Sequence, residues 1–334
     1  MIHVGLVGLG FIGKAHLKAF EGLPNAKVIQ ICSRSGDDEI LNDFTGEITS
    51  EYDALLSNEE IDVVDICVPT FLHEAYIVKA AKAGKNIICE KPLALTVEAT
   101  KRILHIVEKM NVRLFVGHVL RFWPAYQKIK QISEKAEFPA IEMIHAKRLG
   151  QVPTWSEWFQ HPEKSGGALF DLHIHDIDFA YYLLGEVESV YAVGHQNGFG
   201  AWDHIMTTLR FKNQASAFVE ASHTMPSEYP FTMSFRTQAQ DATIDFQLVA
   251  GKNIEHINKT QLFLYEGKNQ SELIIEEADA FKKELAYFIQ CLENNQENTM
   301  IPLDDVLYII ELLEAIEQSL KTGKVQFLES KTVL

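Results

Sequence analysis

The fold of the first third of the chain is decided by residues 2–20, which read IHVGLVGLGFIGKAHLKAF. An apolar run at 2–7 predicts a buried strand, and apolar residues at helical spacing predict a helix over Phe11–Phe20. Between them stands GLGFIG, a G-x-G-x-x-G pattern at Gly8–Gly13. Its glycines allow a tight turn, close approach of a ligand to the backbone, and close packing of the helix on the strand.

This turn predicts a site for a dinucleotide. N–H groups at the start of a helix, together with the positive end of the helix dipole, face the phosphates of a bound nucleotide. The strand before the turn and the helix after it are the context that the motif requires. The alternative is a Gly-rich turn with a structural role only. The residues expected to contact the pyrophosphate are Gly8, Gly10, Phe11, Ile12 and Gly13.

The first 120 residues repeat this alternation of strand and helix. Further apolar runs at 28–32, 63–68, 86–89 and 113–117 predict strands, and helical patterns separate them. Strands separated by helices form right-handed βαβ units. We therefore expect a Rossmann domain, a doubly wound parallel sheet of the α/β class, over residues 1–120.

After residue 120 the pattern changes. Helical patterns at 125–135 and 167–184 are followed, from residue 187 to about 265, by strand-like segments joined by short turns. Two further helical patterns end the chain. We expect an α+β domain over 121–334, with a largely antiparallel open sheet and flanking helices.

Composition limits the partners and the location. The 334 residues suit two domains, and the net charge of −16 disfavours nucleic acid and anionic membrane surfaces. The chain shows neither a signal-peptide pattern nor the ~20 continuous apolar residues of a membrane span. Its four cysteines have no C-x-x-C spacing, which is typical of buried thiols in a reducing compartment. We expect a cytoplasmic protein.

The end of the second predicted strand bears on the choice of cofactor. An Asp or Glu there would bond the adenosine ribose and repel a 2′-phosphate, but the chain offers Ser33 and Arg34. Because Arg can bond a phosphate and stack on adenine, NADP is favoured over NAD. In the alternative, Arg34 is a solvated cation and Asp37 or Asp38 curls back to the ribose, which would favour NAD.

A second motif, Glu90-Lys91-Pro92, directly follows the strand predicted at 86–89. Ligands of doubly wound sheets bind beyond the carboxyl ends of the strands, which places Lys91 at the expected cleft. A lysine desolvated there, beside Glu90 and a cationic nicotinamide, can titrate near neutral pH and exchange a proton with a substrate hydroxyl. The alternative is an ordinary Lys-Pro loop.

The helix predicted at 167–184 carries polar side chains beside its apolar stripe. Asp171 and His175 are four residues apart and are therefore neighbours on one face, with Asp178 further along it. Such a face suits a cleft wall, where His175 transfers a proton or binds a substrate hydroxyl and Asp171 orients it or binds a second hydroxyl. The alternative is a solvated helix face.

The same helix also offers side chains of the kinds that bind metals, namely His173, His175 and Asp176. Helix positions two apart point to different sides, so the two histidines do not readily share one ion. We therefore expect no metal site.

Two further sets of residues are candidates, one where the chain crosses from the first predicted domain to the second and one in a later loop. His118 and Arg121 are candidate substrate contacts, with bracing of the domain hinge as the structural alternative for Arg121. Trp155 and Trp158 belong to a loop that either covers the substrate or only packs against the protein.

In combination, these motifs resemble the glucose–fructose oxidoreductase and inositol dehydrogenase family, which includes the MocA-type proteins. The matching motifs are the turn Gly8–Gly13, Glu90-Lys91-Pro92, Gly117-His118 with Arg121-Phe122, and Gly166-Gly167 followed by Asp171, His175 and Asp178. The resemblance implies hydride transfer between NAD(P) and a sugar, polyol or related carbonyl compound. It also implies homodimers or homotetramers assembled through the open sheet of the second domain.

Carried over by position, the resemblance implies roles for individual residues. Lys91 would be the general acid/base, with Asp171 and His175 as its partners. Thr70 and His73, after the strand predicted at 63–68, would lie near the nicotinamide. Glu90 and Lys91 are also expected among the residues that bind the cofactor.

The chain departs from the family pattern at His173, where family members commonly have Gly. The larger side chain either narrows the pocket or adds a substrate contact. Because fold alone does not fix function, the rival to an enzyme is a non-catalytic regulator that senses a dinucleotide. The presence of Lys91, Asp171 and His175 favours the enzyme. Within enzymes, the rival reaction is reduction of an imine or a tetrapyrrole.

Overall fold

The computed structural model describes the whole chain except residues 35–38, 152–156, 252–256 and 332–334. It forms two compact units, of which the first consists of Met1–Phe122 and Ala278–Leu307 and the second of Trp123–Glu277 and Tyr308–Leu334. The chain thus returns to the first unit at Ala278–Leu307. The expected division at residue 120 had placed this segment in the second domain.

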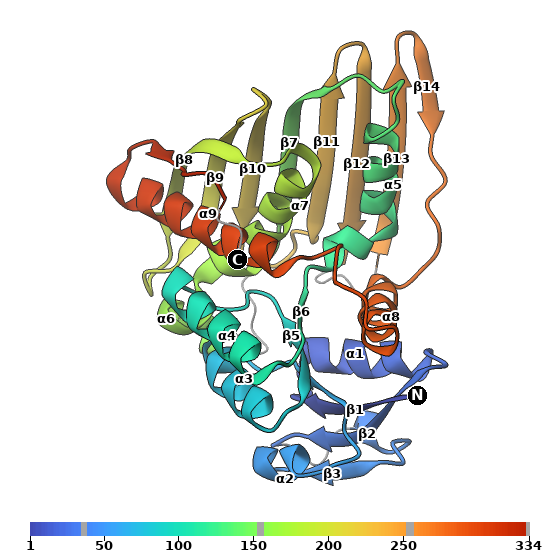
Figure 1. Ribbon diagram of the computed structural model, residues 1–334. Helices are drawn as coiled ribbons and strands as arrows, with labels where there is room; N and C mark the ends of the chain where they lie inside the picture. The colour runs from blue at the N-terminus through green and yellow to red at the C-terminus, as the bar shows by residue number, and fades with distance from the viewer. Residues whose placement is uncertain (35–38, 152–156, 252–256, 332–334) are drawn as a thin grey trace. The chain divides into compact units, whose positions relative to one another are not determined.

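The first unit is built on a six-stranded parallel sheet in the order β3-β2-β1-β4-β5-β6 (Figure 1). Its strands are β1 (Ile2–Val7), β2 (Ala26–Cys32), β3 (Glu47–Thr49), β4 (Val63–Ile66), β5 (Asn86–Glu90) and β6 (Leu114–Gly117). Its helices are α1 (Phe11–Glu21), α2 (Tyr52–Leu56), α3 (His73–Lys82), α4 (Val97–Met110) and α8 (Ala280–Glu293), with short 3-10 turns at Glu39–Leu41, Thr70–Leu72 and Val119–Phe122. This strand order confirms the predicted Rossmann fold.

Burial and capping explain why these segments fold locally as they do. The last four residues of β1 and all of β4 are buried, as expected for central strands of a parallel sheet. The Thr96 hydroxyl caps α4 by accepting a hydrogen bond from the Ala99 N–H at 3.1 Å. Asn111 ends the same helix in the left-handed conformation, with φ of 52°.

Residues 278–307 belong to the first unit because α8 packs an aromatic face against it. The ring centroid of Phe288 lies 5.1 Å from that of Phe115 and 6.0 Å from that of Phe122. The Arg113 guanidinium donates to the carbonyl oxygen of Cys291 near the end of α8. All three aromatic side chains are buried, so α8 completes the core of this unit.

The second unit is built on a nine-stranded sheet in the order β14-β13-β12-β11-β7-β10-β9-β8-β15. Its strands are β7 (Ile141–Leu149), β8 (Val187–Gln196), β9 (Trp202–Phe211), β10 (Ser216–Ser222), β11 (Thr232–Ala239), β12 (Ala242–Ala250), β13 (Ile257–Glu266), β14 (Asn269–Glu272) and β15 (Gln326–Phe327). Neighbouring strands are antiparallel except β7 and β10, which pair in parallel. The largely antiparallel sheet was predicted from the sequence, and the one parallel pair was not.

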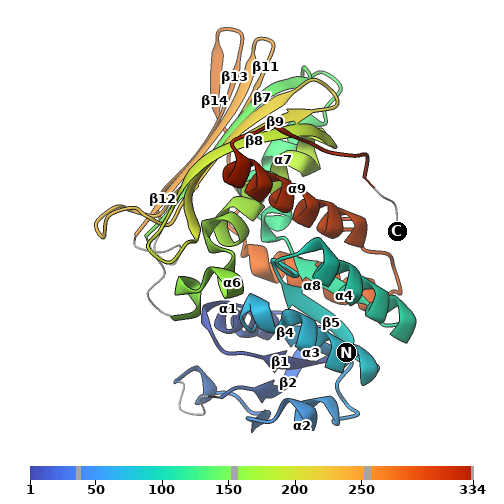
Figure 2. The same ribbon diagram turned by 90° about the vertical axis from the view of Figure 1, so that its left-hand side faces the viewer.

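Helices cover one face of this sheet. They are α5 (Pro124–Ser133), α7 (Ile174–Leu184) and α9 (Leu303–Thr322), of which α9 belongs to this unit from Tyr308 onward. The short helix α6 (Pro162–Ser165) also belongs to this unit. Figures 1 and 2 show α5, α7 and this part of α9 on the same side of the strands. None of the described helices is both long enough and apolar enough to cross a lipid bilayer.

The strands of this sheet have one buried and one exposed face. In β9, Ile205, Thr207 and Leu209 are buried, whereas Met206 and Arg210 are exposed. This alternation is the period of two that a half-buried strand requires. It confirms the predicted open sheet with helices on one side.

A buried ion pair joins α7 to the sheet. Arg148 of β7 donates from Nε to Asp176 Oδ2 at 2.9 Å and from Nη2 to Oδ1 at 3.2 Å. The two side chains are 5% and 0% exposed. Asp176 therefore joins the helix to the sheet, which accounts for a carboxylate at this buried position.

The start of this helical segment differs from the prediction. Leu169–His173 form a turn of π-helix, and the regular α-helix begins only at Ile174. Asp171 and His175 therefore do not have the regular four-residue relation of an α-helix on which the prediction relied. Such π turns are frequent at functional sites.

Asp176→Ala removes one partner of the buried pair and leaves the Arg148 guanidinium buried without that carboxylate. We expect the free energy of unfolding of the second unit to fall by roughly 3–5 kcal/mol. Urea denaturation followed by circular dichroism measures this loss. The control is Glu317→Ala, which removes an exposed pair with Lys321 in α9 and should cost less than about 1 kcal/mol. Equal losses in the two variants would contradict the role given to Asp176.

Candidate functional site

The glycine turn joins β1 to α1 at the carboxyl end of the sheet. The Gly8 N–H donates to the carbonyl oxygen of Cys32, the last residue of β2, at 3.0 Å. Gly8 has φ of +94°, a conformation that favours glycine. Among the described residues, no side chain caps the start of α1, and no acidic residue lies in its first turn. The positive end of the helix dipole at this turn therefore favours an anionic ligand.

The three glycines of the motif differ in the space around them. A Cβ on Gly8 would lie 2.7 Å from the Cys67 carbonyl oxygen, and a Cβ on Gly13 would lie 1.9 Å from the Gly8 carbonyl oxygen. A Cβ on Gly10 would meet no atom within 4 Å. Gly8 and Gly13 thus allow backbone to pack on backbone, and Gly10 leaves open space at the helix start. That space is what a pyrophosphate requires, so the turn fits a dinucleotide.

The end of β2 lies at the same edge of the sheet. The Ser33 N–H donates to the Thr49 carbonyl oxygen at 2.9 Å, and Arg34 is exposed. Ser33 and Arg34 thus lie at the carboxyl edge of the sheet, as the sequence predicted for the end of this strand. Asp37 and Asp38, the alternative partners of the ribose, lie outside the described residues.

Lys91 follows the last residue of β5 and is half-buried. Its N–H donates to the Glu90 carboxylate at 3.2 Å. Because β1 and β5 are parallel strands of one sheet, Lys91 and the glycine turn lie at the same carboxyl edge. This is the edge at which the sequence motifs predicted a cleft.

A cluster of buried titratable groups lies beneath this edge. His16 of α1 has its Nδ1 2.8 Å from Asp65 Oδ2 and its Nε2 3.2 Å from Glu90 Oε1. The His16 and Asp65 side chains are 1% and 0% exposed. The Cys67 sulfur lies 3.4 Å from the same His16 Nδ1. Glu284 of α8 brings a carboxylate within 4.8 Å of the ligand atoms of His16 and Glu90.

These contacts control the charges of the cluster. Burial lowers the pKa of His16, but Asp65 and Cys67 outweigh it and the net pKa lies well above its ordinary value. Burial raises the pKa of Glu90, but His16 and Lys91 outweigh it and the net pKa is lowered. The cluster therefore holds a protonated imidazole between two carboxylates.

Glu90 was expected among the cofactor contacts, and the structure places it differently. Its carboxylate is buried against His16 instead of facing the open edge. Gly117, its neighbour on β6, makes room for it, because a Cβ there would lie 2.6 Å from Glu90 Oε1. The buried Glu90 carboxylate therefore explains why the Gly117-His118 motif has glycine at its first position.

His73 also lies inside the unit and joins two loops. Its Nδ1 is 2.9 Å from the Pro92 carbonyl oxygen and its Nε2 is 2.9 Å from the Val68 carbonyl oxygen. Burial lowers the pKa of His73. The ring therefore ties the loop after β4 to the loop that follows Lys91. Thr70, also expected near the nicotinamide, is largely buried at the start of the 3-10 turn before α3.

Two of the three candidate substrate contacts are buried and bonded within their own unit. Arg121 is buried, and its Nη1 donates to Met300 O at 2.7 Å and to Asp305 Oδ2 at 2.8 Å. In the second unit, His173 is completely buried, with Nε2 2.8 Å from the Thr207 hydroxyl. Burial lowers the pKa of His173 to about 3, so the ring is neutral.

Both side chains are thus bonded inside their own unit, and a role of Arg121 and His173 in binding substrate stays a prediction. The third candidate, His118, is also buried, with 3% of its surface exposed.

The second unit presents Asp171 and His175 near the start of the helix. Both are half-buried, whereas Asp178, expected on the same polar face, is buried. Asp171 Oδ2 lies 3.1 Å from Nε2 of His223, a residue that no motif had singled out. The structure thus pairs Asp171 with a second histidine, which comes from the end of β10.

Aromatic side chains lie beside this pair. The rings of Trp158 and Phe159 stack with centroids 4.1 Å apart. The Phe159 ring also meets the His223 ring edge-on at 6.4 Å. Trp158 therefore contributes at least to packing, and Trp155 lies outside the described residues.

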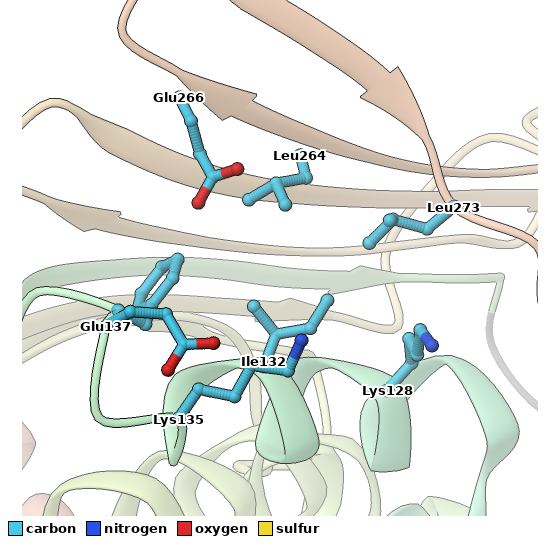
Figure 3. Close-up of a pocket in the computed structure, with 8 residues that line it drawn as sticks. Lys128, Ile132, Lys135, Glu137, Leu264, Glu266 and Leu273 are labelled. Carbon is cyan, nitrogen blue, oxygen red and sulfur yellow. The ribbon is translucent and has the colours of Figure 1, made fainter.

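A separate hollow of about 290 Å³ lies between α5 and the end of the sheet (Figure 3). Its walls carry lysines and glutamates of opposite charge around aliphatic side chains. The residues are Lys128, Ile132, Lys135, Glu137, Phe138, Leu264, Glu266 and Leu273. None of the predicted site residues lines it, so we do not assign the reaction to this hollow.

Comparison with known proteins decides the family. A model described as an oxidoreductase family with an NAD-binding Rossmann fold matches residues 2–118, and a GFO/IDH/MocA C-terminal domain matches residues 126–244. The uncharacterized oxidoreductase YrbE of Bacillus subtilis is 30% identical over 335 residues, 96% of this chain and 95% of that protein. The chain belongs to the GFO/IDH/MocA family. It is therefore an enzyme of an oxidoreductase family, and the resemblance drawn from the motifs is confirmed.

Other members of the family carry more specific names. A scyllo-inositol 2-dehydrogenase (NAD(+)) of Bacillus subtilis is 29% identical, covering 96% of this chain and 95% of that one. A crystal structure of a putative NADPH-dependent oxidoreductase from Desulfitobacterium hafniense aligns with a TM-score of 0.86 at 22% identity, covering 98% of this chain and 97% of that one. This likeness shows that the two proteins share a fold over nearly the whole of both chains.

Sequence motifs missed the buried partners of the site. His16 lies three residues after Gly13, one turn along α1, but nothing in the sequence indicates that it faces Asp65. His223 and Asp203 follow or lie within ordinary β-strands. The one available signal was polar residues in apolar segments, and it does not say which partner each one meets.

His16→Gln tests the charge of the buried imidazole. Because the folded pKa of His16 is raised, its protonated ring stabilises the fold fully below the ordinary value of 6.5 and this contribution is lost as the pH rises through the folded pKa. We expect the difference in free energy of unfolding between the parent and this variant to be larger at about pH 6 than at about pH 9. Denaturant titrations at both pH values measure it.

The control for this test is Leu17→Ala, which alters a buried neighbour on α1 that does not titrate. It should lower the stability by a similar amount at both pH values. A His16→Gln difference that stays level or grows with pH would show that the ring is neutral in the folded protein.

Proposed function

We propose that this enzyme transfers a hydride between a nicotinamide dinucleotide and a secondary alcohol or carbonyl carbon of a sugar, polyol or related compound. The observation that supports this most is the open start of α1 at Gly10, at the same sheet edge as Lys91. The similarity to a protein named scyllo-inositol 2-dehydrogenase supports a polyol-like substrate.

The residues that would hold the dinucleotide belong to the first unit. The turn Gly8–Gly13 would bind the pyrophosphate through its N–H groups, with Phe11 and Ile12 in the first turn of α1. Ser33 and Arg34 would meet the adenosine ribose. Thr70 would lie toward the nicotinamide, and His73 would act indirectly by holding the loop that follows Lys91. When bound, the nicotinamide supplies the acceptor or donor of the hydride.

The chain's own residues would handle the proton. In the oxidative direction, a neutral Lys91 amine accepts the hydroxyl proton as the carbon–hydrogen bond is broken, and in the reductive direction the ammonium returns it. His175 and Asp171 would bind the same substrate hydroxyls and pass the proton onward. The Glu90 carboxylate, held by His16, places a negative charge next to Lys91.

Lys91→Met tests this assignment because it removes the amine and keeps a side chain of similar length. We expect kcat on the best substrate of a panel of polyols, sugars and keto-sugars to fall by about 10²–10⁴-fold. Affinity for the dinucleotide should stay within a few-fold. Nicotinamide absorbance measures turnover, and fluorescence titration measures binding.

The control for Lys91 is Lys82→Met, which removes an exposed lysine of α3 and should leave turnover unchanged. Activity of Lys91→Met equal to that of the parent would refute the role of the amine. A panel without any turnover, in protein that binds the dinucleotide, would count against the proposed substrate class.

We propose NADP as the preferred cofactor over NAD. The support is Arg34, an exposed cation that follows the end of β2 after Ser33. The names of similar proteins mention both NADPH and NAD, so they do not decide the preference.

Arg34→Ala should weaken NADPH binding more than NADH binding, because only NADPH carries the 2′-phosphate that the guanidinium would bond. Fluorescence titration with both dinucleotides measures the two affinities. Lys27→Ala, an exposed cation at the opposite end of β2, is the matched control and should change neither. If Arg34→Ala lowered the affinities for NADPH and NADH equally, Arg34 would not select between them and the proposed preference would fail.

The exposed face of the nine-stranded sheet supports assembly into homodimers or homotetramers. Met206 of β9, Phe218 of β10 and Tyr191 of β8 are 51%, 44% and 40% exposed on neighbouring strands. Large apolar side chains gathered on one face are typical of an interface between subunits. The four cysteines are free thiols, which supports a cytoplasmic location.

A further inference from the structure

The pairing of Asp171 with His223 points to a role that the family motifs do not contain. His223 follows β10, and its side chain is 5% exposed while that of Asp171 is 26% exposed. The distance from Nε2 to Asp171 Oδ2 is 3.1 Å. The buried ring thus approaches the more exposed carboxylate from the interior of the second unit.

The other side of the imidazole faces a second carboxylate. Nδ1 of His223 lies 4.0 Å from Asp203 Oδ1, and the two residues are also joined by a backbone hydrogen bond from the His223 N–H to the Asp203 carbonyl oxygen at 2.8 Å. His223 therefore has a carboxylate at each ring nitrogen. The Phe159 ring packs edge-on against the His223 ring, with 6.4 Å between the two ring centroids.

Asp203 is itself held firmly. It is buried, Oδ1 accepts a hydrogen bond from the Ala168 N–H at 3.2 Å, and Oδ2 accepts one from the Asn197 amide. Ala168 directly precedes the π turn that carries Asp171. Asp203 thus ties together the start of that turn and the strand end that presents His223.

The chemistry of the pair follows from its geometry. A carboxylate only accepts hydrogen bonds, so Nε2 of His223 must carry a proton to bond Asp171. A hydrogen bond from a donor of restricted rotation favours one rotamer of the carboxylate and favours its ionised form. The donor, its anchor on Asp203 and the π turn all belong to the same unit.

We propose that His223 is a positioning residue for the proton-transfer site. It donates from Nε2 to Asp171 and keeps that carboxylate ionised and oriented toward the substrate hydroxyl that Lys91 and His175 act on. Asp203 and Phe159 hold the His223 ring in place. This inference rests on the proposed function.

Two variants separate a donor from mere packing. His223→Leu fills the space without a donor, whereas His223→Gln keeps an N–H near the place of Nε2. On the best substrate of the panel, we expect kcat to fall by about 100-fold in the Leu variant, with KM within a few-fold. The Gln variant should regain most of the loss. The acid limb of the pH–rate profile should move to higher pH in the Leu variant, because the carboxylate without its donor is protonated more readily.

A second measurement does not depend on turnover. Long-range ¹H–¹⁵N spectra of ¹⁵N-histidine-labelled enzyme should show the His223 ring protonated at Nε2. The Asp171→Asn variant should shift this signal. The signal of a histidine distant from the pair should not shift and serves as the reference.

The outcomes are distinct. A His223 ring protonated only at Nδ1, or a Leu variant as active as the parent, or a Gln variant as impaired as the Leu variant, each overturns the inference. If no compound of the panel is turned over while the ring is protonated at Nε2 and responds to Asp171→Asn, the pairing holds and the proposed substrate class fails instead.

Discussion

The contact between Gly13 and the Gly8 carbonyl oxygen is the constraint on which the first unit depends. A Cβ at Gly13 would lie only 1.9 Å from that oxygen, so the helix can approach the turn only because no side chain is present. One turn later, the same helix directs His16 between Asp65 and the carboxylate that precedes Lys91. A steric requirement of the cofactor turn therefore also determines the electrostatic surroundings of the proposed general base.

In the second unit the constraint is different, because the helix that carries the polar groups must also pack on an apolar sheet. The buried pair of Arg148 and Asp176 anchors the helix, and the π turn before it carries Asp171. His223, at the end of a strand, completes the polar contacts of that turn. Secondary structure on both sides restricts the orientation of the carboxylate, as the proposed proton transfer at a defined atom would require.

Burial divides the polar residues of the motifs into two groups. Lys91, Asp171 and His175 remain partly exposed, whereas Glu90, Arg121 and His173 are buried and bonded within their own unit. The motifs had grouped both kinds as possible contacts of ligands. Charged groups are costly to bury without partners, so the inward-facing members each acquired one, such as Asp305 for Arg121. A motif can therefore contain residues that support the site without touching a ligand.

The sequence by itself determined the order of strands and helices in the Rossmann unit, the half-buried open sheet and the site of the dinucleotide turn. These features depend on glycine geometry and on the periods of apolar residues, which are local properties of the chain. Only the tertiary structure decided that 278–307 complete the first unit, that the helix begins with a π turn, and that His16 meets Asp65 and His223 meets Asp171. The partners in those last two pairs are 49 and 52 residues apart. Which side chains meet over such distances depends on strand order and register, and no local pattern of residues encodes it.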